Sequence, residues 1–232
     1  MSWRWQQLVR ARFTLVLVVF LTFIHLVISR LDDPDHAYLL YGLTRQNLLH
    51  GQLWKLISYA FLHGNLTHLI TNAVMLLLLG SRLEWILGPR KLAEIFLFST
   101  LMGGIFHALF VPGDAPLVGS SGAAMGFLLC FCTIDPYAKV IPLQLHAGKL
   151  GMGVFLSSFI FTIIHPDLGI PVLSTLGNAL VKLAGTSIFS VGHACHLGGC
   201  VAGFALAKWY LRLRYSKESL QRERERFTKH LR

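Results

Sequence analysis

Gly119-Ser120-Ser121-Gly122 directly precedes an apolar run that extends from Ala123 to Ile134. A second apolar run contains Cys195-His196-Leu197-Gly198-Gly199. Polar side chains are costly in hydrocarbon, so a hydroxyl and an imidazole among glycines in such runs indicate a reaction site. The two stretches together predict an all-α membrane protein that holds Ser121 and His196 within its bundle.

The overall composition supports the membrane class. Of the 232 residues, 54% are hydrophobic and only 14% are charged, and the mean hydropathy is +0.57. Soluble domains carry about 25% charged residues, so an ordinary soluble domain is excluded. The four cysteines all lie in apolar stretches, where cysteine is commonly a small buried hydrophobe, and they offer no disulfide framework.

Six apolar stretches predict six membrane-spanning helices. Several are shorter than the roughly 20 residues that a lipid-exposed helix needs. We expect these to extend through polar flanks or to be sheltered inside the bundle. The stretches are Phe13 to Ser29, Leu66 to Leu79, Leu92 to Val111, Gly122 to Ile134, Leu150 to Ile164 and Ile188 to Leu211.

The distribution of positive charge predicts the orientation. Six spans place most of the 21 Lys and Arg residues on the side that holds both termini, leaving Arg30, Arg45, Lys55 and Lys182 on the other. By the positive-inside rule both termini are cytoplasmic, and a bacterial inner membrane is the expected location. We therefore expect a cytoplasmic N-terminus at 1–12, the helical domain at 13–214 and a basic cytoplasmic tail at 215–232. The net charge of +10 gathers in that tail and does not predict nucleic-acid binding.

The polar residues of three stretches fall at one predicted level. His68 and Asn72 are four residues apart, so on a helix they face the same way. The second, fourth and sixth stretches cross the membrane in the same direction, and each carries its polar group near its outer end. His196 lies about eight residues into the sixth stretch, which corresponds to a depth of roughly 12 Å.

These residues supply the parts that acyl transfer requires, namely a nucleophile, a base and donors to an oxyanion. Ser121 offers the hydroxyl, and His196 can accept its proton. His68, Asn72 and the backbone N–H of Ser121 can bind the developing negative charge. None of the eleven acidic residues lies in an outer half-span near His196, so a Ser-His dyad with no metal and no cofactor is predicted.

Glycine spacing predicts that the helices carrying these residues approach closely. Gly122 and Gly126 have small-xxx-small spacing, and so do Gly199 and Gly203. This spacing allows two helix backbones to come together.

In their order, these motifs resemble those of the rhomboid family of intramembrane serine proteases, over the length from Phe13 to about Leu211. The resemblance implies a six-transmembrane-helix rhomboid-like bundle that cleaves transmembrane proteins within the lipid bilayer. It also implies Ser121 as nucleophile, His196 as general base and an oxyanion hole that includes His68 and Asn72. The matching parts are Trp54-Lys55, His63 with His68 and Asn72, Gly119-x-Ser121-Gly122, and His196-x-x-Gly199-x-x-x-Gly203.

Two positions depart from the family pattern. Family members usually have Trp-Arg in the first outer loop, whereas Lys55 lacks the planar fork of arginine. Many members also have an aromatic residue four positions after the serine, against the catalytic imidazole. Here that position is Met125, whose thioether can still pack on a ring.

Other polar residues have structural interpretations. We expect His193 to share a wet cavity with His196, and His25 and His107 to be hydrogen-bonded inside the bundle. Glu84 is expected to tie helices together. His63 is expected to be a structural residue or a residue at the outer membrane surface.

We expect substrates to be cut near the outer end of a transmembrane segment. Proteins with C-terminal sorting tails are one possible substrate class.

Three other classes of function fit the sequence less well. A metal or haem protein is suggested by His193-Ala194-Cys195-His196, but the His-Glu-x-x-His pattern of a zinc protease is missing. A non-catalytic relative that binds membrane segments is expected to lack the nucleophile or the base, and this chain has both. A transporter is disfavoured because no span carries acidic or basic relay residues.

Overall fold

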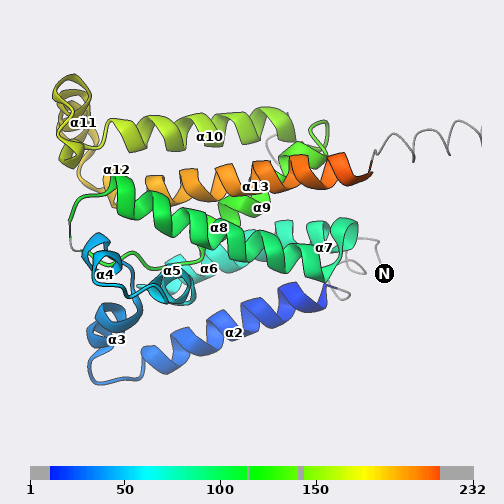
Figure 1. Ribbon diagram of the computed structural model, residues 1–232, viewed down its shortest axis with the longest axis horizontal. Coiled ribbons are helices and arrows are strands. Elements are labelled where there is room, and N and C mark those ends of the chain that lie inside the picture. The colour runs from blue at the N-terminus through cyan, green and yellow to red at the C-terminus, as the bar shows by residue number, and fades with distance from the viewer. Residues whose placement is uncertain (1–10, 114, 141–143, 215–232) are drawn as a thin grey trace, which may run out of the picture.

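The computed structural model describes residues 11–113, 115–140 and 144–214. Its long helices run side by side along one axis, and the described ends of the chain meet at the same end of the bundle (Figure 1). The predicted N-terminal segment 1–12, apart from residues 11 and 12, and the predicted basic tail 215–232 lie outside the described residues.

The described chain is mostly helical. A two-residue antiparallel pair, β1 with β2, joins α9 to α10 and is the only sheet among the described residues. The elements are α2 Arg12–Ile28, α3 Pro34–Tyr41, α4 Arg45–Leu49, α5 Lys55–Ser58, η1 Tyr59–Phe61, α6 Leu66–Met75, η2 Leu76–Gly80, α7 Ser81–Leu87, α8 Pro89–Phe110, α9 Ser121–Ile134, β1 Lys139–Val140, β2 Leu145–His146, α10 Ala147–Ile163, η3 Pro166–Leu168, α11 Pro171–Ala184, α12 Ser187–Ser190 and α13 His193–Arg214.

Each predicted apolar stretch contains a helix, but two boundaries differ from the prediction. The second stretch continues to Leu87, because α6, the π-helical turn η2 and α7 follow one another without a break. Gly88, at a φ of 84°, ends it, and Pro89 opens α8 at once. The sixth helix begins at His193 and not at Ile188, because the chain turns between α12 and α13. His196 is therefore in the first turn of its helix and not about eight residues into it, as the sequence predicted.

The helix α9 forms the centre of the bundle. It packs against α8, α10, α13 and η2, and its residues from Gly122 to Cys132 are buried except for Met125. Glycines set the spacing between α9 and α13. A side chain at Gly199 would collide with the carbonyl oxygen of Gly122, and one at Gly203 with that of Gly126. This contact aligns the first turns of α9 and α13, which carry Ser121 and His196.

Glu84 ties the second helical stretch to the start of the first. Its buried carboxylate accepts hydrogen bonds from the backbone N–H groups of Phe13 and Thr14, each at 3.0 Å, and from the Thr14 hydroxyl at 2.8 Å. A carboxylate at a helix N-terminus satisfies unpaired donors and complements the helix dipole. The interpretation of Glu84 as a tie between helices is thus confirmed.

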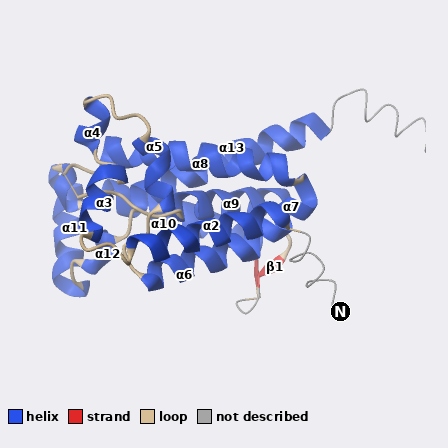
Figure 2. Ribbon diagram, turned by 90° about the horizontal axis from the view of Figure 1, so that it is seen from below, coloured by secondary structure: helices blue, strands red, loops and turns tan. Residues whose placement is uncertain are grey.

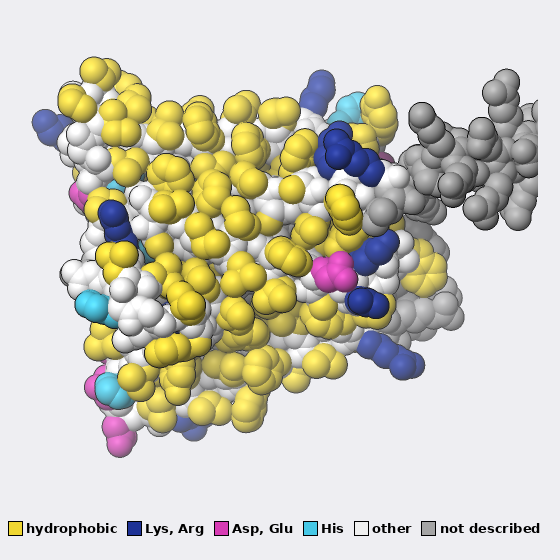
Figure 3. Space-filling model, in the orientation of Figure 1, with side chains coloured by type: hydrophobic (Ala, Val, Ile, Leu, Met, Phe, Trp, Pro, Cys, Tyr) yellow, Lys and Arg dark blue, Asp and Glu magenta, His cyan; other side chains and the backbone are white. Residues whose placement is uncertain are grey.

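The flank of the bundle is apolar. Figure 3 shows hydrophobic side chains over the middle of the molecule, with the charged side chains toward its two ends. Two helices, residues 66–87 and 89–110, are long and apolar enough to cross a membrane, and shorter apolar helices cover residues 12–28, 121–134 and 147–163. A total of six spans stays a prediction.

Candidate active site

One cavity of about 840 Å³ opens at the end of the bundle away from the described chain termini. Its walls come from the first turns of α6, α9 and α13, from the ends of α8 and α10, and from the loops between them. The sequence-predicted residues Ser121, His196, His68, Asn72 and Met125 all line it, together with His193. The fold therefore gathers side chains that are up to 128 positions apart in the sequence.

Ser121 is the first residue of α9 and follows a tight turn at Gly119. Gly119 has a φ of 112°, which favours glycine, and its N–H donates to the carbonyl of Tyr59 at 2.9 Å. A Cβ added at Gly119 would lie 2.5 Å from Cε1 of His68 and 3.5 Å from Nδ2 of Asn72. The turn that presents Ser121 thus lies directly against the two predicted oxyanion donors.

His68 and Asn72 project from the first two turns of α6. Asn65 caps this helix by accepting a hydrogen bond from the backbone N–H of His68 at 2.8 Å. Asn72 is 4% exposed, and its Nδ2 has no hydrogen-bond partner within the described part of the chain. Its amide is thus a buried donor at the cavity wall without an acceptor.

His196 lies beside a second imidazole. Its backbone N–H donates to the carbonyl of Gly192 at 2.9 Å. The ring of His193 is edge-on to that of His196, with centroids 6.3 Å apart. His193 is itself fixed, because its Nε2–H donates to the carbonyl of Ile188 at 2.7 Å and its ring stacks on Phe161 at 4.8 Å. His193 therefore forms part of the cavity wall, as the sequence indicated.

The Ser121 hydroxyl and the His196 imidazole share the cavity without a direct bond. No hydrogen bond joins them within the described ranges. Catalytic hydrogen bonds are often long in enzymes without substrate and tighten when substrate binds, so geometry of this kind is compatible with a nucleophile and its base.

His63 supports the turn before the nucleophile. Its Nε2 lies 3.3 Å from the hydroxyl of Ser120, and its backbone carbonyl accepts from the Tyr38 hydroxyl at 3.0 Å and from Nδ1 of His25 at 3.1 Å. The structural interpretations of His63 and His25 are confirmed. The pairing with Ser120 was missed, although two adjacent serines in the motif were the signal for it.

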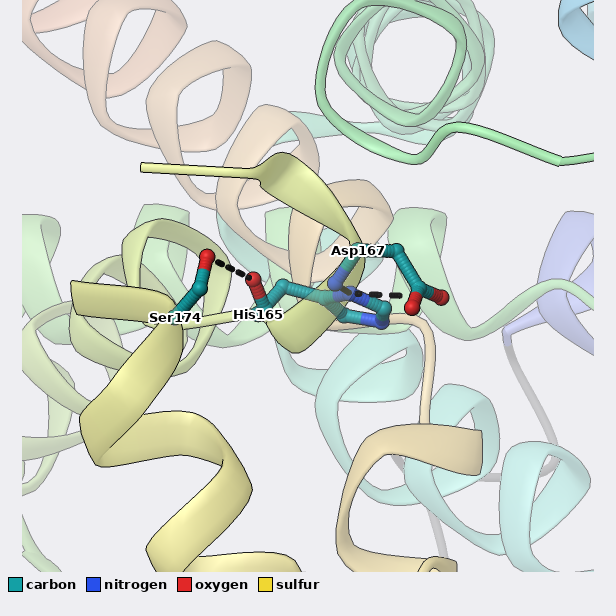
Figure 4. A network of polar contacts seen from close by, with 3 residues as sticks. All are labelled: His165, Asp167 and Ser174. Atoms are coloured by element: carbon teal, nitrogen blue, oxygen red, sulfur yellow. Dashed lines mark hydrogen bonds and ion pairs between the residues drawn. The ribbon is translucent and has the colours of Figure 1, made fainter. Parts of the chain in front are cut away.

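The prediction that His107 is hydrogen-bonded inside the bundle is contradicted at Nδ1. His107 is buried in α8 and lines the cavity, but its Nδ1 has no hydrogen-bond partner among the described residues. Near it, His165, the N-cap of η3, and Asp167 within η3 line the cavity wall. His165 Nδ1 lies 3.9 Å from the Asp167 carboxylate and accepts the Asp167 N–H at 3.3 Å, while Ser174 donates to the His165 carbonyl (Figure 4).

Lys55 stabilises the first loop through a hydrogen bond. Its Nζ donates to the carbonyl of Leu39 at 2.8 Å, and its side chain is buried. Burial lowers the pKa of Lys55 from its ordinary value. The neighbouring Trp54 is exposed. In this chain, a single lysine amine thus bonds one backbone carbonyl, where a guanidinium would present several donors.

The part of the chain that the structure describes contains no group of three or more His, Cys, Asp or Glu side chains placed to hold a metal ion. Of the two imidazoles that suggested a metal or haem site in the sequence, that of His193 donates to the carbonyl of Ile188.

Comparisons with known proteins agree with the motifs. A rhomboid domain model matches residues 50–213. RHOMBOID-like protein 5 of Arabidopsis thaliana is 35% identical over 88 residues, which cover 38% of this chain and 28% of that protein. The mitochondrial Rhomboid protein 1 of Saccharomyces cerevisiae is 27% identical over 180 residues, which cover 74% of this chain and 44% of that protein. Inactive RHOMBOID-like protein 8 of Arabidopsis thaliana is 32% identical over 77 residues, which cover 33% of this chain and 22% of that protein. The matches thus span less than half the length of each relative.

Proposed function

The chain belongs to the rhomboid family, whose members are embedded in membranes, and we propose that it is a serine endopeptidase that cleaves membrane-anchored proteins inside the bilayer. One observation carries the proposal. A single cavity is lined by a hydroxyl at a helix N-terminus, an imidazole and two further side-chain donors, Ser121, His196, His68 and Asn72.

In the proposed reaction, Oγ of Ser121 attacks the scissile carbonyl carbon while His196 accepts the hydroxyl proton. The tetrahedral intermediate then collapses, the C–N bond breaks, and His196 returns the proton to the leaving amine. Water entering the cavity then attacks the acyl carbon and gives a proton to His196. The acyl C–Oγ bond breaks, His196 returns that proton to Oγ of Ser121, and the second product leaves as a carboxylic acid. Among the described residues no carboxylate is bonded to the imidazole of His196, so packing in the first turn of α13 orients it.

The oxyanion is bound by donors already aimed at the cavity. Nδ2 of Asn72 is buried and has no acceptor in the described structure, and the His68 ring lies against the turn at Gly119. The backbone N–H groups at the start of α9 add donors with the positive end of the helix dipole. Donors fixed before the reaction stabilise developing charge without a cost of reorganisation.

The proposed setting is a bundle of six spans with both termini in the cytoplasm, in a bacterial inner membrane. The cavity then lies toward the outer face, so the scissile bond is near the outer end of the substrate's transmembrane segment. A helical peptide bond is protected, and a substrate with weak helix formers near the site opens at lower cost. Proteins with C-terminal sorting tails are one substrate class for this arrangement.

A fluorophosphonate probe tests the activated hydroxyl directly. The intact protein in detergent should be labelled covalently at Ser121, as located by mass spectrometry, while Ser121→Ala and His196→Ala should not be labelled. Ser157→Ala, at an exposed serine of α10, is the matched control, and it should keep labelling at Ser121. Labelling that survives in Ser121→Ala would contradict the proposal, because the activated nucleophile would then be another residue. Labelling that fails in the intact and folded protein would also contradict it and would favour a non-catalytic relative.

A further inference from the structure

The helix α11 stands apart from the bundle in direction. It spans Pro171–Ala184 and begins with the proline, which suits the first position of a helix. In two views at right angles it lies across the cavity end of the bundle, whereas α10 and α13 run along the bundle (Figures 1 and 2). If the bundle axis crosses the bilayer, α11 lies parallel to the membrane plane.

One face of α11 is packed on the protein, and this fixes the rotation of the helix. Ser174 and Gly177 are buried on that face. The Ser174 hydroxyl donates to the carbonyl of His165 at 3.3 Å, as Figure 4 shows. At Gly177 a side chain would collide with the carbonyl of Ile164. The helix can therefore not turn its other faces inward without losing these contacts.

The outward surface of α11 is divided into two stripes. The apolar stripe has helical spacing, and its ends are strongly exposed, Val172 at 73% and Leu183 at 85%. The polar stripe is about a quarter-turn away, given 3.6 residues per turn. The apolar stripe consists of Val172, Leu176, Ala179 and Leu183, and the polar stripe of Thr175, Asn178 and Lys182.

The apolar stripe continues an apolar surface of the bundle. The neighbouring helix α10 exposes large hydrophobic side chains along its length, and Figure 3 shows hydrophobic side chains extending from α11 over this flank. Those of α10 are Met152, Leu156, Phe159 and Ile160. A surface of this kind on a membrane-embedded family member faces lipid, and the stripe extends it to the end of the bundle.

We propose that α11 is an interfacial helix that rests on the lipid surface at the cavity end, with its apolar stripe in the lipid and its polar stripe in water. An amphipathic helix in the membrane plane buries one face at the headgroup boundary, and this requires neighbouring apolar and polar faces of the kind seen here. Lys182 fits the same position, because a lysine stem can reach along apolar surface while its amine stays in water.

The proposed contact of α11 with lipid also affects the position of one wall of the cavity. The segment that follows α11 carries Phe189, whose ring is edge-on to His165 at 5.2 Å and lies 6.5 Å from His193. Because α11 binds the His165 backbone through Ser174, a helix anchored on lipid holds this wall of the cavity in place. The position of α11 relative to lipid is independent of whether the protein cleaves substrates.

Spin labels distinguish the two stripes. The four native cysteines are buried, so cysteines introduced singly at Leu183 and Asn178 can be labelled selectively with a nitroxide. In the full-length protein reconstituted in phospholipid vesicles, collisions with oxygen, which concentrates in lipid, are compared with collisions with a water-soluble nickel chelate. The label at 183 should favour oxygen, and the label at 178 should favour nickel. Val172→Cys on the apolar stripe and Thr175→Cys on the polar stripe form a second matched pair. All variants are compared only when their thermal unfolding matches that of the unsubstituted protein.

Equal nickel accessibility at 183 and 178, with the second pair agreeing, would overturn the proposal. So would protection at 183 that disappears when the protein is diluted in lipid, because the stripe would then contact a second copy of the chain. Protection at 183 that arises only when a single-span substrate is added would likewise replace lipid with substrate as the occupant.

Discussion

At the residue scale, the most informative atom in the cavity is Nδ2 of Asn72. A buried donor without an acceptor costs about 1 to 3 kcal/mol, and native structures contain few of them. Asn72 is buried beside the turn that presents Ser121, so an acceptor bound in the cavity would relieve this cost. The proposed acceptor is the oxyanion of the transition state.

Asn72→Ala should therefore lower kcat by about 100- to 1,000-fold with a smaller effect on KM, because the lost donor acts on charge that develops in the transition state. Initial rates on a reconstituted single-span substrate measure this. Asn178→Ala, on the exposed polar stripe of α11, is the control and should keep the original rate. An unchanged kcat in Asn72→Ala would remove this residue from the oxyanion hole.

The turn at Gly119 allows a second residue-scale prediction with a matched control. Gly119 and Gly113 both have positive φ values, 112° and 129°, but only Gly119 has His68 next to the position of a Cβ, while Gly113 has open space. Both alanine variants should lose about 1 to 3 kcal/mol of stability from backbone strain. Gly119→Ala should in addition lose activity, because His68 must move. Equal activity in two folded variants would show that this turn does not position the site.

At the scale of elements, the contact of α9 with α13 determines how Ser121 meets His196. Gly199→Ala places a methyl group against the carbonyl of Gly122, so the helices must separate. We expect the free energy of unfolding to fall by about 1 to 3 kcal/mol, together with a loss of activity. Thermal unfolding measures the loss of stability. Gly153→Ala, in α10 with nothing within 4 Å, should be neutral or stabilising by up to about 1 kcal/mol. Similar effects of the two substitutions would mean that close packing of α9 on α13 is unimportant.

The elements also show where sequence reasoning succeeds. Long apolar stretches predicted the helices, and glycine spacing indicated the close packing at Gly199 and Gly203, because both depend on local composition. The boundary at His193 was missed because the run from Ile188 stays apolar, while the backbone bends at Val191, between α12 and α13. The helix α11 was missed because its Ser174 and Gly177 become a buried face only against Ile164 and His165, which is a tertiary contact.

At the scale of the whole molecule, the two ends of the bundle differ. One end holds the described chain termini, and the other holds the cavity, the loop helices α3 to α5 and α11 (Figure 1). Candidate residues for the cavity could be predicted because serine, histidine and asparagine are unusual in apolar stretches. The unpaired Nδ1 of His107 could not be, since hydrogen-bond satisfaction depends on neighbours that the sequence does not order.

The central claim is that Ser121 and His196 cleave a membrane-anchored chain near one end of its transmembrane segment. The most direct test incubates the reconstituted protein with a model single-span substrate and determines the product termini by mass spectrometry. We predict one main cut near the outer end of that segment, abolished equally by Ser121→Ala, by His196→Ala and by the double substitution, because nucleophile and base act as a unit. Cleavage that persists in folded Ser121→Ala, or a cut confined to the cytoplasmic end of the segment, would contradict the account.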